Sequence, residues 1–447
     1  MFLEMMNLSF INSIIGLLPH EFNINGKEIP DIYMAFSLAA CLAIPCTKIL
    51  RSKFSLKKIY NFSIFVIGIS FLSAFTTHNW YFFCAARAAQ GFFITAIYSI
   101  SFVNAISESR NKENTINFIS GLAVAGLILG PLLSGVLSVI NWRLIYVIAI
   151  TILIIIYFIH LKLPADNKID TDFEFSYYEY LLFVGILFGI SFAVDASNIN
   201  SHYYFIDFLF TMTMLVIFSM HYIKSENTKL FNKAIFNKNL LYSSLVNFFV
   251  RFALIGTAPL ASLVLHQNYS VTIPEISIYL AIGAIASLAG KFIFKIIIVR
   301  KNHAVNYIFF AITLVSLPVA IKFLNPHTGL TLFFSIFGLF SSLIFNYINS
   351  SFYLHQPLNL SSEATAISNI FQLFFYGICV NALFFSWFNI QALIKNTFYS
   401  LIIIMTGLSL LSLASLYFYQ RLIKNESRNL GCGKRRRCLV LRSLFKR

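Results

Sequence analysis

The chain is built from long apolar stretches separated by short polar connections. Apolar stretches of the ~20 residues that a helix needs to cross a bilayer recur from one end to the other. Residues 144–161 are apolar on every face, whereas a membrane β-strand alternates apolar and polar positions. Because backbone groups in lipid must form hydrogen bonds within their own segment, we expect helices. The expected spans are residues 2–18, 31–50, 59–76, 79–106, 116–140, 144–161, 178–195, 203–223, 240–265, 276–299, 304–324, 329–354, 364–388 and 397–423.

These spans predict an all-α polytopic membrane protein with 14 transmembrane helices. Helices of ~21 residues would use roughly 290 of the 447 residues. The connections are therefore too short to hold a water-soluble domain. The first span begins at Phe2 without the basic region and cleavage site of a signal peptide, so we expect it to be retained.

Composition supports a location in the membrane. Hydrophobic residues make up 58% of the chain and charged residues 11%, against ~25% charged residues in soluble proteins. The mean hydropathy is +0.77. These values exclude a water-soluble globular protein.

Lysine and arginine are concentrated in alternate connections, such as residues 48–58, 224–238 and 291–301, and in the tail after Arg421. Because these residues accumulate in short cytoplasmic loops, we expect both termini to be cytoplasmic. The net charge of +16 then reflects topology, and no nucleic acid is expected as a partner. The opposite side carries few basic residues, namely Lys27, Arg143, Lys322 and Lys395.

The sequence carries few signals for covalent chemistry. It has no metal-ligand spacing and no phosphate-binding glycine loop, so we expect no metal, no cofactor, no ATP hydrolysis and no enzyme activity. Cys432 and Cys438 lie in a basic tail, Lys434 to Arg447, which suits either anionic lipid headgroups or plain solvent. The other cysteines fall within spans and form no disulfide framework: Cys41, Cys46, Cys84 and Cys379.

Small residues are concentrated in the fifth span. At three- to five-residue spacing, such residues form a flat helix face against which another helix can approach closely. A proline in the same span removes one backbone hydrogen bond and permits a bend. Ordinary small-residue packing explains the same pattern in any membrane bundle. The residues are Gly121, Gly126, Gly130, Pro131, Ser134 and Gly135.

The fourth span contains Arg87, Gln90 and Gly91. An arginine inside a span is costly unless it faces an internal cavity and meets acceptors, so Arg87 is a functional candidate. The alternative is a structural clamp on neighbouring carbonyl groups. Because a guanidinium group does not release its proton in proteins, Arg87 would act on protons through a nearby acid.

Both motifs resemble those of drug:proton antiporters in the major facilitator superfamily. Gly126, Gly130, Pro131, Ser134 and Gly135, preceded by Gly121, resemble the fifth-helix antiporter motif. Arg87, Gln90 and Gly91 resemble the fourth-helix R-x-x-Q-G signature, whose arginine is associated with proton transfer. With fourteen expected spans, the chain resembles the fourteen-helix members of this family over residues 2–423.

The resemblance implies two six-helix halves and two inserted helices. The corresponding ranges are residues 1–162 for the N-terminal half, 163–237 for the two additional helices and their linkers, and 238–423 for the C-terminal half. Residues 424–447 form the basic cytoplasmic tail. A cavity between the halves, exposed alternately to each side, follows from the same resemblance.

The chain departs from the family at acidic positions. Where the family usually carries an aspartate in the first helix, this sequence has Asn7, which cannot carry a proton. Glu4 lies one helical turn before Asn7 and is the expected replacement, because a carboxyl group in an apolar site takes up a proton more readily. A residue at the cytoplasmic interface is the alternative for Glu4. Ser52 replaces the acid in the loop between spans two and three.

Further candidates are the other polar residues within or beside the spans. Asp195 and Asp207 flank a short connection and are proton-coupling candidates with Glu4 and Arg87, or else interfacial residues. Gln372 stands where the family carries an arginine. Any of the polar residues could equally link helices by hydrogen bonds. The candidates for a substrate cavity are Asn7, Asn12, Asn247, Arg251, Asn369 and Gln372.

The resemblance implies a multi-pass membrane protein that exports amphipathic or lipophilic compounds in exchange for protons. High isoleucine, asparagine and phenylalanine usage is typical of an AT-rich bacterial genome, so we expect the cell inner membrane. Its partners would be a small-molecule substrate, protons and the bilayer, together with a periplasmic adaptor protein as in some relatives. Two alternatives remain open. The protein would export one defined metabolite such as a siderophore, or it would be a non-transporting membrane scaffold or sensor with the same fold.

Overall fold

A computed structural model describes residues 1–109, 112–162, 176–196, 201–224, 230, 256–297, 303–323, 326–354 and 361–429. Within these ranges the secondary structure is helical and contains no strand. The first helices are α1 (Phe2–Ile14), α2 (Leu18–Phe22), the 3-10 helix η1 (Gly26–Glu28), α3 (Asp31–Lys53), α4 (Leu56–Thr76), α5 (Trp80–Glu108), α6 (Lys112–Ser138) and α7 (Leu144–Leu161).

The later helices begin with α8 (Tyr177–Ala196) and α9 (Ser201–Lys224). Residues 256–269 are also helical, and the remaining part of the span expected at 240–265 lies outside the described residues. The chain continues through α11 (Ile273–Ile297), α12 (His303–Phe323), α13 (Pro326–Leu354), α14 (Ser361–Ile394) and α15 (Thr397–Asn429). The other expected spans coincide with these helices to within a few residues, apart from the first span and longer C-terminal ends of α14 and α15.

The first helix is shorter than the expected span. Residues 2–18 were expected as one helix, but α1 ends at Ile14 and a second short helix, α2, starts at Leu18. Pro19 lies in the first turn of α2. Because proline lacks a backbone N–H and its ring clashes with the carbonyl of the residue four positions earlier, α1 cannot continue through this point.

Eight helical segments of the described chain are long and apolar enough to cross a bilayer. This agrees with the expectation of a multi-pass membrane protein. The segments are Gly26–Thr47, Leu56–Thr76, Trp80–Phe102, Gly121–Ser138, Leu144–Leu161, Phe205–Lys224, Ile273–Gly290 and Leu373–Ile394.

Helix α4 illustrates how these helices are oriented in the bundle. Phe62, Phe65, Ile69 and Leu72 are exposed and recur every three or four residues, so they share one outer face. Ser70 on the opposite side is buried. An apolar exterior with polar groups inside is expected when the surrounding medium is lipid rather than water.

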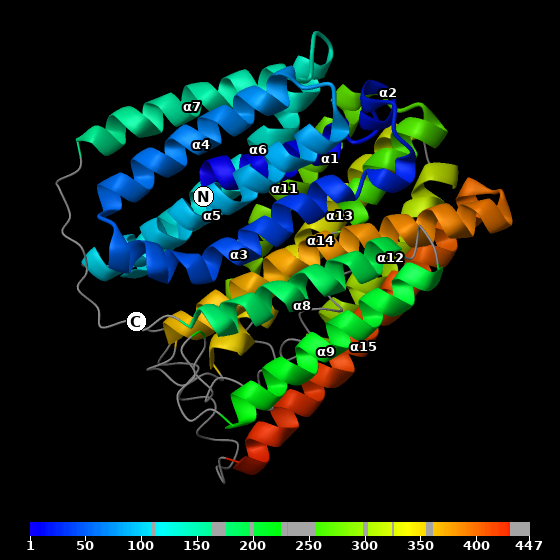
Figure 1. The fold of residues 1–447 in the computed structure, drawn as a ribbon. Coiled ribbons are helices and arrows are strands. Elements are labelled where there is room, and N and C mark those ends of the chain that lie inside the picture. The colour runs from blue at the N-terminus through cyan, green and yellow to red at the C-terminus, as the bar shows by residue number, and fades with distance from the viewer. Residues whose placement is uncertain are drawn as a thin grey trace.

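The helices pack in two groups (Figure 1). In the N-terminal group, α1 to α7, α1 packs against α6, and α5 packs against both α3 and α4. The C-terminal group consists of residues 256–269 and α11 to α15, in which α13 packs against α11 and α12, and α12 packs against α15. The groups contact each other mainly through α6 with α11 and α3 with α14, with smaller contacts of α1 with α11 and of η1 with α14.

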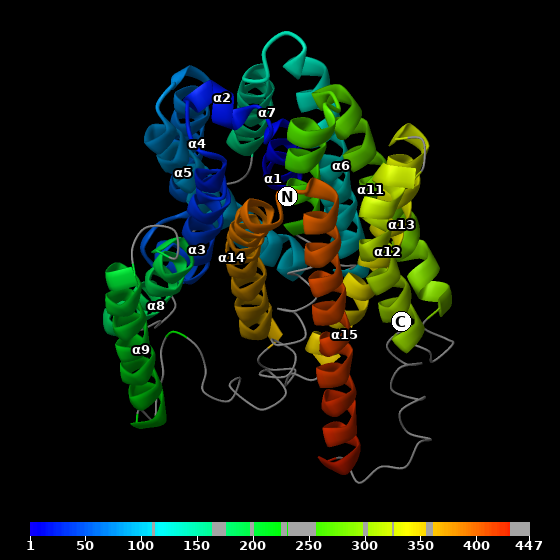
Figure 2. The ribbon, with the colours of Figure 1, turned by 90° about the vertical axis from the view of Figure 1, so that its right-hand side faces the viewer.

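Helices α8 and α9 form a pair at one edge of the molecule, away from α11, α12 and α13 (Figure 2). Helix α8 packs against α3 and α14, and α9 packs against α8. The Tyr180 hydroxyl of α8 donates to the Leu42 carbonyl of α3 at 3.3 Å. The pair is therefore attached where the two groups meet through α3 and α14.

Candidate functional site

Arg87 of α5 lies in the interior of the N-terminal group with 1% of its surface exposed. Its Nη1 donates to Asn7 Oδ1 at 2.6 Å and to Gln90 Oε1 at 2.9 Å. The guanidinium group also lies over the Phe36 ring, 4.7 Å from its centroid. This position is consistent with the prediction that the Arg87 charge faces the interior and meets hydrogen-bond acceptors.

Asn7 and Gln90 connect Arg87 to the surrounding helices. Asn7 Nδ2 donates to Gln90 Oε1 at 3.2 Å, which joins α1 to α5. Gln90 Nε2 donates to the Ser70 carbonyl of α4 at 3.3 Å. The structure therefore joins Asn7 of the first helix to two residues of the R-x-x-Q-G segment in one network, which we call the Arg87 network: Arg87, Asn7 and Gln90.

Gly91 allows α5 to approach α3 closely. A Cβ atom added at Gly91 would lie 2.2 Å from the Phe36 carbonyl oxygen, so no larger residue fits without moving the α3 backbone. Phe36 is also the residue whose ring covers Arg87. Gly91 thus helps to place this aromatic ring against the buried charge.

Glu4 is buried with 2% of its surface exposed. Thr95 Oγ1 of α5 donates to Glu4 Oε1 at 3.5 Å, whereas Glu4 Oε2 is buried without a hydrogen-bond partner. Glu4 lies one helical turn before Asn7 on α1. A carboxyl group with an unpartnered buried oxygen is better suited to the protonated state than to the charged one.

Asn12 lies farther along α1 and contacts both groups of helices. The Tyr33 hydroxyl of α3 donates to Asn12 Oδ1 at 2.8 Å. The Tyr33 ring packs edge-on against Tyr376 of α14, with 5.6 Å between centroids. This cluster of Asn12, Tyr33 and Tyr376 places polar groups where the N-terminal and C-terminal groups meet.

The small residues of α6 face different neighbours. A Cβ atom at Gly126 would meet the Phe2 carbonyl of α1 at 2.4 Å, and one at Gly130 would meet the Met6 carbonyl at 2.8 Å. At Gly135 it would meet Ser277 of α11 at 2.4 Å, whereas at Gly121 it would meet nothing within 4 Å. The expected flat face is therefore confined to Gly126 and Gly130, and Gly135 faces the C-terminal group.

Ser134 also contributes to the contact of α6 with α1. The Ser134 hydroxyl donates to the Pro131 carbonyl at 2.9 Å and hydrogen bonds with Ser13 of α1. Ser9 of α1 donates to the Gly126 carbonyl at 3.2 Å. Glycine packing and hydroxyl hydrogen bonds together hold α1 against α6.

Several candidates are not part of these clusters. Asp207 lies on α9 with an intermediate exposure, and its Oδ2 is buried without a hydrogen-bond partner. Since α9 packs at the edge of the molecule, Asp207 lies away from the Arg87 network (Figure 2). Asn247 and Arg251 lie outside the described residues, as do the side chains of Asp195, Asn369 and Gln372.

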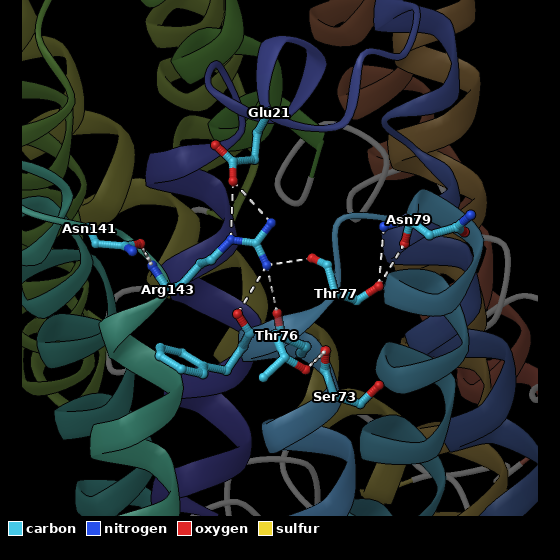
Figure 3. A network of polar contacts seen from close by, with 9 residues as sticks. Glu21, Ser73, Thr76, Thr77, Asn79, Asn141 and Arg143 are labelled. Carbon is cyan, nitrogen blue, oxygen red and sulfur yellow. Dashed lines mark hydrogen bonds and ion pairs between the residues drawn. The ribbon is translucent and has the colours of Figure 1, made fainter.

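Arg143 forms a polar network that the sequence did not indicate (Figure 3). Only 4% of its surface is exposed. Its Nε and Nη2 donate to Glu21 Oε1 at 3.1 and 3.0 Å, and its Nη1 donates to the Thr77 carbonyl at 2.6 Å. The same Nη1 donates to the carbonyls of Ala74 and Phe75. Arg143 was expected as a loop charge, but it ties α2 to the end of α4.

Glu179 of α8 is a second buried carboxylate that the sequence did not indicate. His221 Nε2 of α9 lies 3.1 Å from Glu179 Oε1, and the Leu230 backbone N–H donates to Oε2 at 2.7 Å. Both oxygens of Glu179 therefore have partners, unlike those of Glu4. In the described part of the chain, no three His, Cys, Asp or Glu side chains are placed to hold a metal ion.

The chain matches a known protein family over most of its length. Residues 1–379 match the family model described as Major Facilitator Superfamily. A curated relative from Haemophilus influenzae, named "Probable transport protein HsrA", is 21% identical over 368 residues, which are 78% of this chain and 77% of the relative.

Solved transporter structures share the fold at low sequence identity. A peptide transporter crystallised in complex with sulfate superposes with a TM-score of 0.68 at 12% identity, covering 94% of this chain and 93% of its own. A D-xylose-proton symporter gives 0.67 at 11% identity, covering 94% of both chains. The nucleoside transporter NupG gives 0.60 at 13% identity, covering 93% of this chain and 97% of its own.

Proposed function

Because the chain belongs to the major facilitator superfamily, we propose that it exports amphipathic or lipophilic compounds in exchange for protons. It is a multi-pass membrane transporter and not an enzyme. The proposal places it among the fourteen-helix drug:proton antiporters, with both termini in the cytoplasm of a bacterial cell and the helices in the inner membrane. The two groups of helices then correspond to the two halves of the transporter.

The burial of Glu4 beside the Arg87 network carries the proton-coupling part of this proposal. A proton-driven carrier needs a carboxyl group that is protonated and deprotonated in turn, and Asn7 cannot serve. Of the two buried carboxylates among the described side chains, Glu179 has partners for both oxygens and Glu4 does not. Glu4 therefore carries the proton, and the nearby positive charge of Arg87 influences its protonation.

Contacts between the groups support alternating access. Gly135 of α6 touches Ser277 of α11, and Gly26 touches Phe388 of α14. Gly16, just after α1, touches His266. These contacts lie at the end of the bundle that contains α2, which we call the α2 end, and they close it. Substrate release to that side requires these contacts to separate.

The proposal is tested by proton movement in proteoliposomes that hold an imposed pH gradient. Wild type, Glu4→Gln and Arg87→Ala are challenged with a panel of lipophilic cations and amphipathic acids. We expect wild type to dissipate the gradient when a substrate is added, and both variants to lose this response. Glu28→Gln, the same chemical change at the α2 end, serves as the control and keeps the response. Failure of every compound to move protons through the wild-type protein contradicts the proposal.

A further inference from the structure

The positive charge of Arg87 has no negative partner among the residues that the structure describes. Its Nη1 bonds only to the neutral amide oxygens of Asn7 and Gln90, and its Nε is buried without a hydrogen-bond partner. Arg87 forms no ion pair with the described residues. The titratable groups close enough to interact with it electrostatically are neutral in their ordinary state: Tyr33, Cys84, Tyr146 and Tyr376.

Asn7 is the reason for this imbalance. An aspartate at the same position would place a carboxylate against the guanidinium group, at the site where Asn7 Oδ1 now lies 2.6 Å from Nη1. Glu4 does not replace it, since its hydrogen bond goes to Thr95 and its second oxygen has no partner. The Arg87 network therefore carries a net charge of one positive unit.

A buried cation without a counterion is costly in a bundle that lies in lipid. The rings of Phe36 and Phe10, 4.7 and 5.9 Å from the guanidinium carbon, offset part of this cost. An anionic group would offset much more, because a guanidinium group binds carboxylates and sulfonates through charge-assisted hydrogen bonds. Nε has no hydrogen-bond partner and would donate to such a group in a conformation that admits the ligand.

Arg87 also lies close to the contact between the two groups of helices. Tyr376 of α14 lies near Arg87 and packs edge-on against Tyr33 of α3. A ligand held by Arg87 would thus be within reach of side chains from both groups. This is the position that a transported compound occupies when access alternates between the two sides.

We propose that the transported compound is an amphipathic organic anion whose acidic group binds Arg87. This inference rests on the proposed export function and narrows its substrate class from lipophilic compounds in general to those that carry a carboxylate or a related acidic group. Aromatic neighbours such as Phe10 and Phe36 suit the apolar part of such a compound.

Three dansyl compounds with the same fluorophore and different charge test the inference. Dansylglycine carries a carboxylate, dansylcadaverine an ammonium group, and dansylamide no charge. Their binding to the full-length protein in nanodiscs is measured by dansyl fluorescence, with the signal of empty nanodiscs subtracted. We expect wild type to bind dansylglycine about tenfold more tightly than dansylcadaverine, as one charge-assisted contact would give.

Two variants examine the role of the charge. Asn7→Asp has nearly the shape of the wild type and supplies the missing carboxylate, and Arg87→Gln removes the cation. We expect each variant to lose the preference for dansylglycine, with size-exclusion elution and thermal midpoint showing that it is folded. Gly121→Ala adds a Cβ atom with no neighbour within 4 Å and serves as the control that retains the preference.

Any of three results overturns the inference. The wild type binds dansylglycine no more tightly than dansylcadaverine, it binds none of the three compounds, or both variants keep the preference. A separate flux measurement distinguishes this failure from failure of the proposed function. Proton-coupled export of dansylcadaverine without any preference for dansylglycine leaves the export function standing and removes the anion site. Preferential binding of dansylglycine without proton movement supports the anion site and contradicts proton-coupled export.

Discussion

Arg87 and Arg143 are both buried in the N-terminal group of helices, but their charges are balanced differently. Arg143 has the Glu21 carboxylate and three backbone carbonyl groups as partners. Arg87 has two amide oxygens and no carboxylate among the described residues. Removing a partner from a fully paired buried charge is strongly destabilising. A buried charge without a counterion would instead gain from binding an anionic ligand.

The Arg143 network is predicted to stabilise the α2 end. Arg143→Gln removes the ion pair and leaves three carbonyl groups without their donor, so we expect the free energy of unfolding to fall by roughly 2–3 kcal/mol. Glu21→Gln should cost less, because the Glu21 side chain is 32% exposed and solvent already screens its charge. Thermal unfolding of the purified protein measures both effects. Lys27→Gln, at an exposed lysine of the same end, is the control, and an equal loss in Lys27→Gln and Arg143→Gln would disprove the prediction.

Sequence reasoning found one of these two arginines and missed the role of the other. Arg87 lies within an apolar span, and a charge in that position must face the interior. Arg143 follows a span and looks like any basic residue of a connection. Its burial depends on the chain turning at Pro19, which places Glu21 beside it, and no local pattern reports a contact between residues so far apart.

At the scale of elements, the glycines of one motif in α6 face two different helices. Gly126 and Gly130 are four residues apart and share the face toward α1, whereas Gly135 is five residues further on and faces α11. At 3.6 residues per turn, a five-residue step rotates the helix by about 140°. The spacing predicted close packing, but it does not tell which neighbour each glycine meets.

Gly121 and Gly126, both in the middle of α6, should differ in their effect on stability. A Cβ atom at Gly126 would lie 2.4 Å from the Phe2 carbonyl and 2.9 Å from the Met6 nitrogen, both backbone atoms that cannot move aside. We expect Gly126→Ala to lower the free energy of unfolding by ~1–3 kcal/mol. Gly121→Ala meets no neighbour and should leave it unchanged or raise it by up to ~1 kcal/mol. Thermal unfolding in detergent measures both, and a larger loss in Gly121→Ala would contradict this assignment.

Gly135 should affect conformation more than folding, because its neighbour Ser277 belongs to the other group of helices. We expect Gly135→Ala to hold the groups apart at the α2 end and to reduce transport. A cysteine at Leu17, in the turn between α1 and α2, should then react faster with a membrane-impermeant maleimide. The double variant Gly135→Ala with Ser277→Gly restores the room that the new methyl group needs and should return both measurements toward wild type. Unchanged labelling in Gly135→Ala, or no rescue, would rule out this contact as part of the closure.

At the scale of the whole molecule, the groups meet mainly through two pairs of helices, α6 with α11 and α3 with α14. Hydropathy predicted nearly every described helix and its order, because a segment that crosses the bilayer must be apolar and must form its backbone hydrogen bonds within a helix. Hydropathy did not predict which helices pack against each other. That depends on close backbone approach at particular glycines, such as Gly377 against Met34 and Gly338 against Gly283, and on side chains far apart in the sequence.

Because Glu4 is proposed to carry the proton during alternating access, its protonation should decide which end of the bundle is open. The distance between the groups at the α2 end reports this directly. Spin labels at Val139, in the turn after α6, and at Gln267, in the helix of residues 256–269, lie on different groups and on exposed positions. Double electron–electron resonance then measures the distribution of distances between the labels, in a background without the six native cysteines.

We expect the wild-type distribution to change between high and low pH. Glu4→Gln mimics the protonated carboxyl group, so at high pH it should reproduce the wild-type distribution at low pH and should no longer respond to pH. Glu28→Gln, the control, should behave like the wild type. A Glu4→Gln protein that still responds to pH as the wild type does, or a wild type that does not respond at all, would contradict the claim.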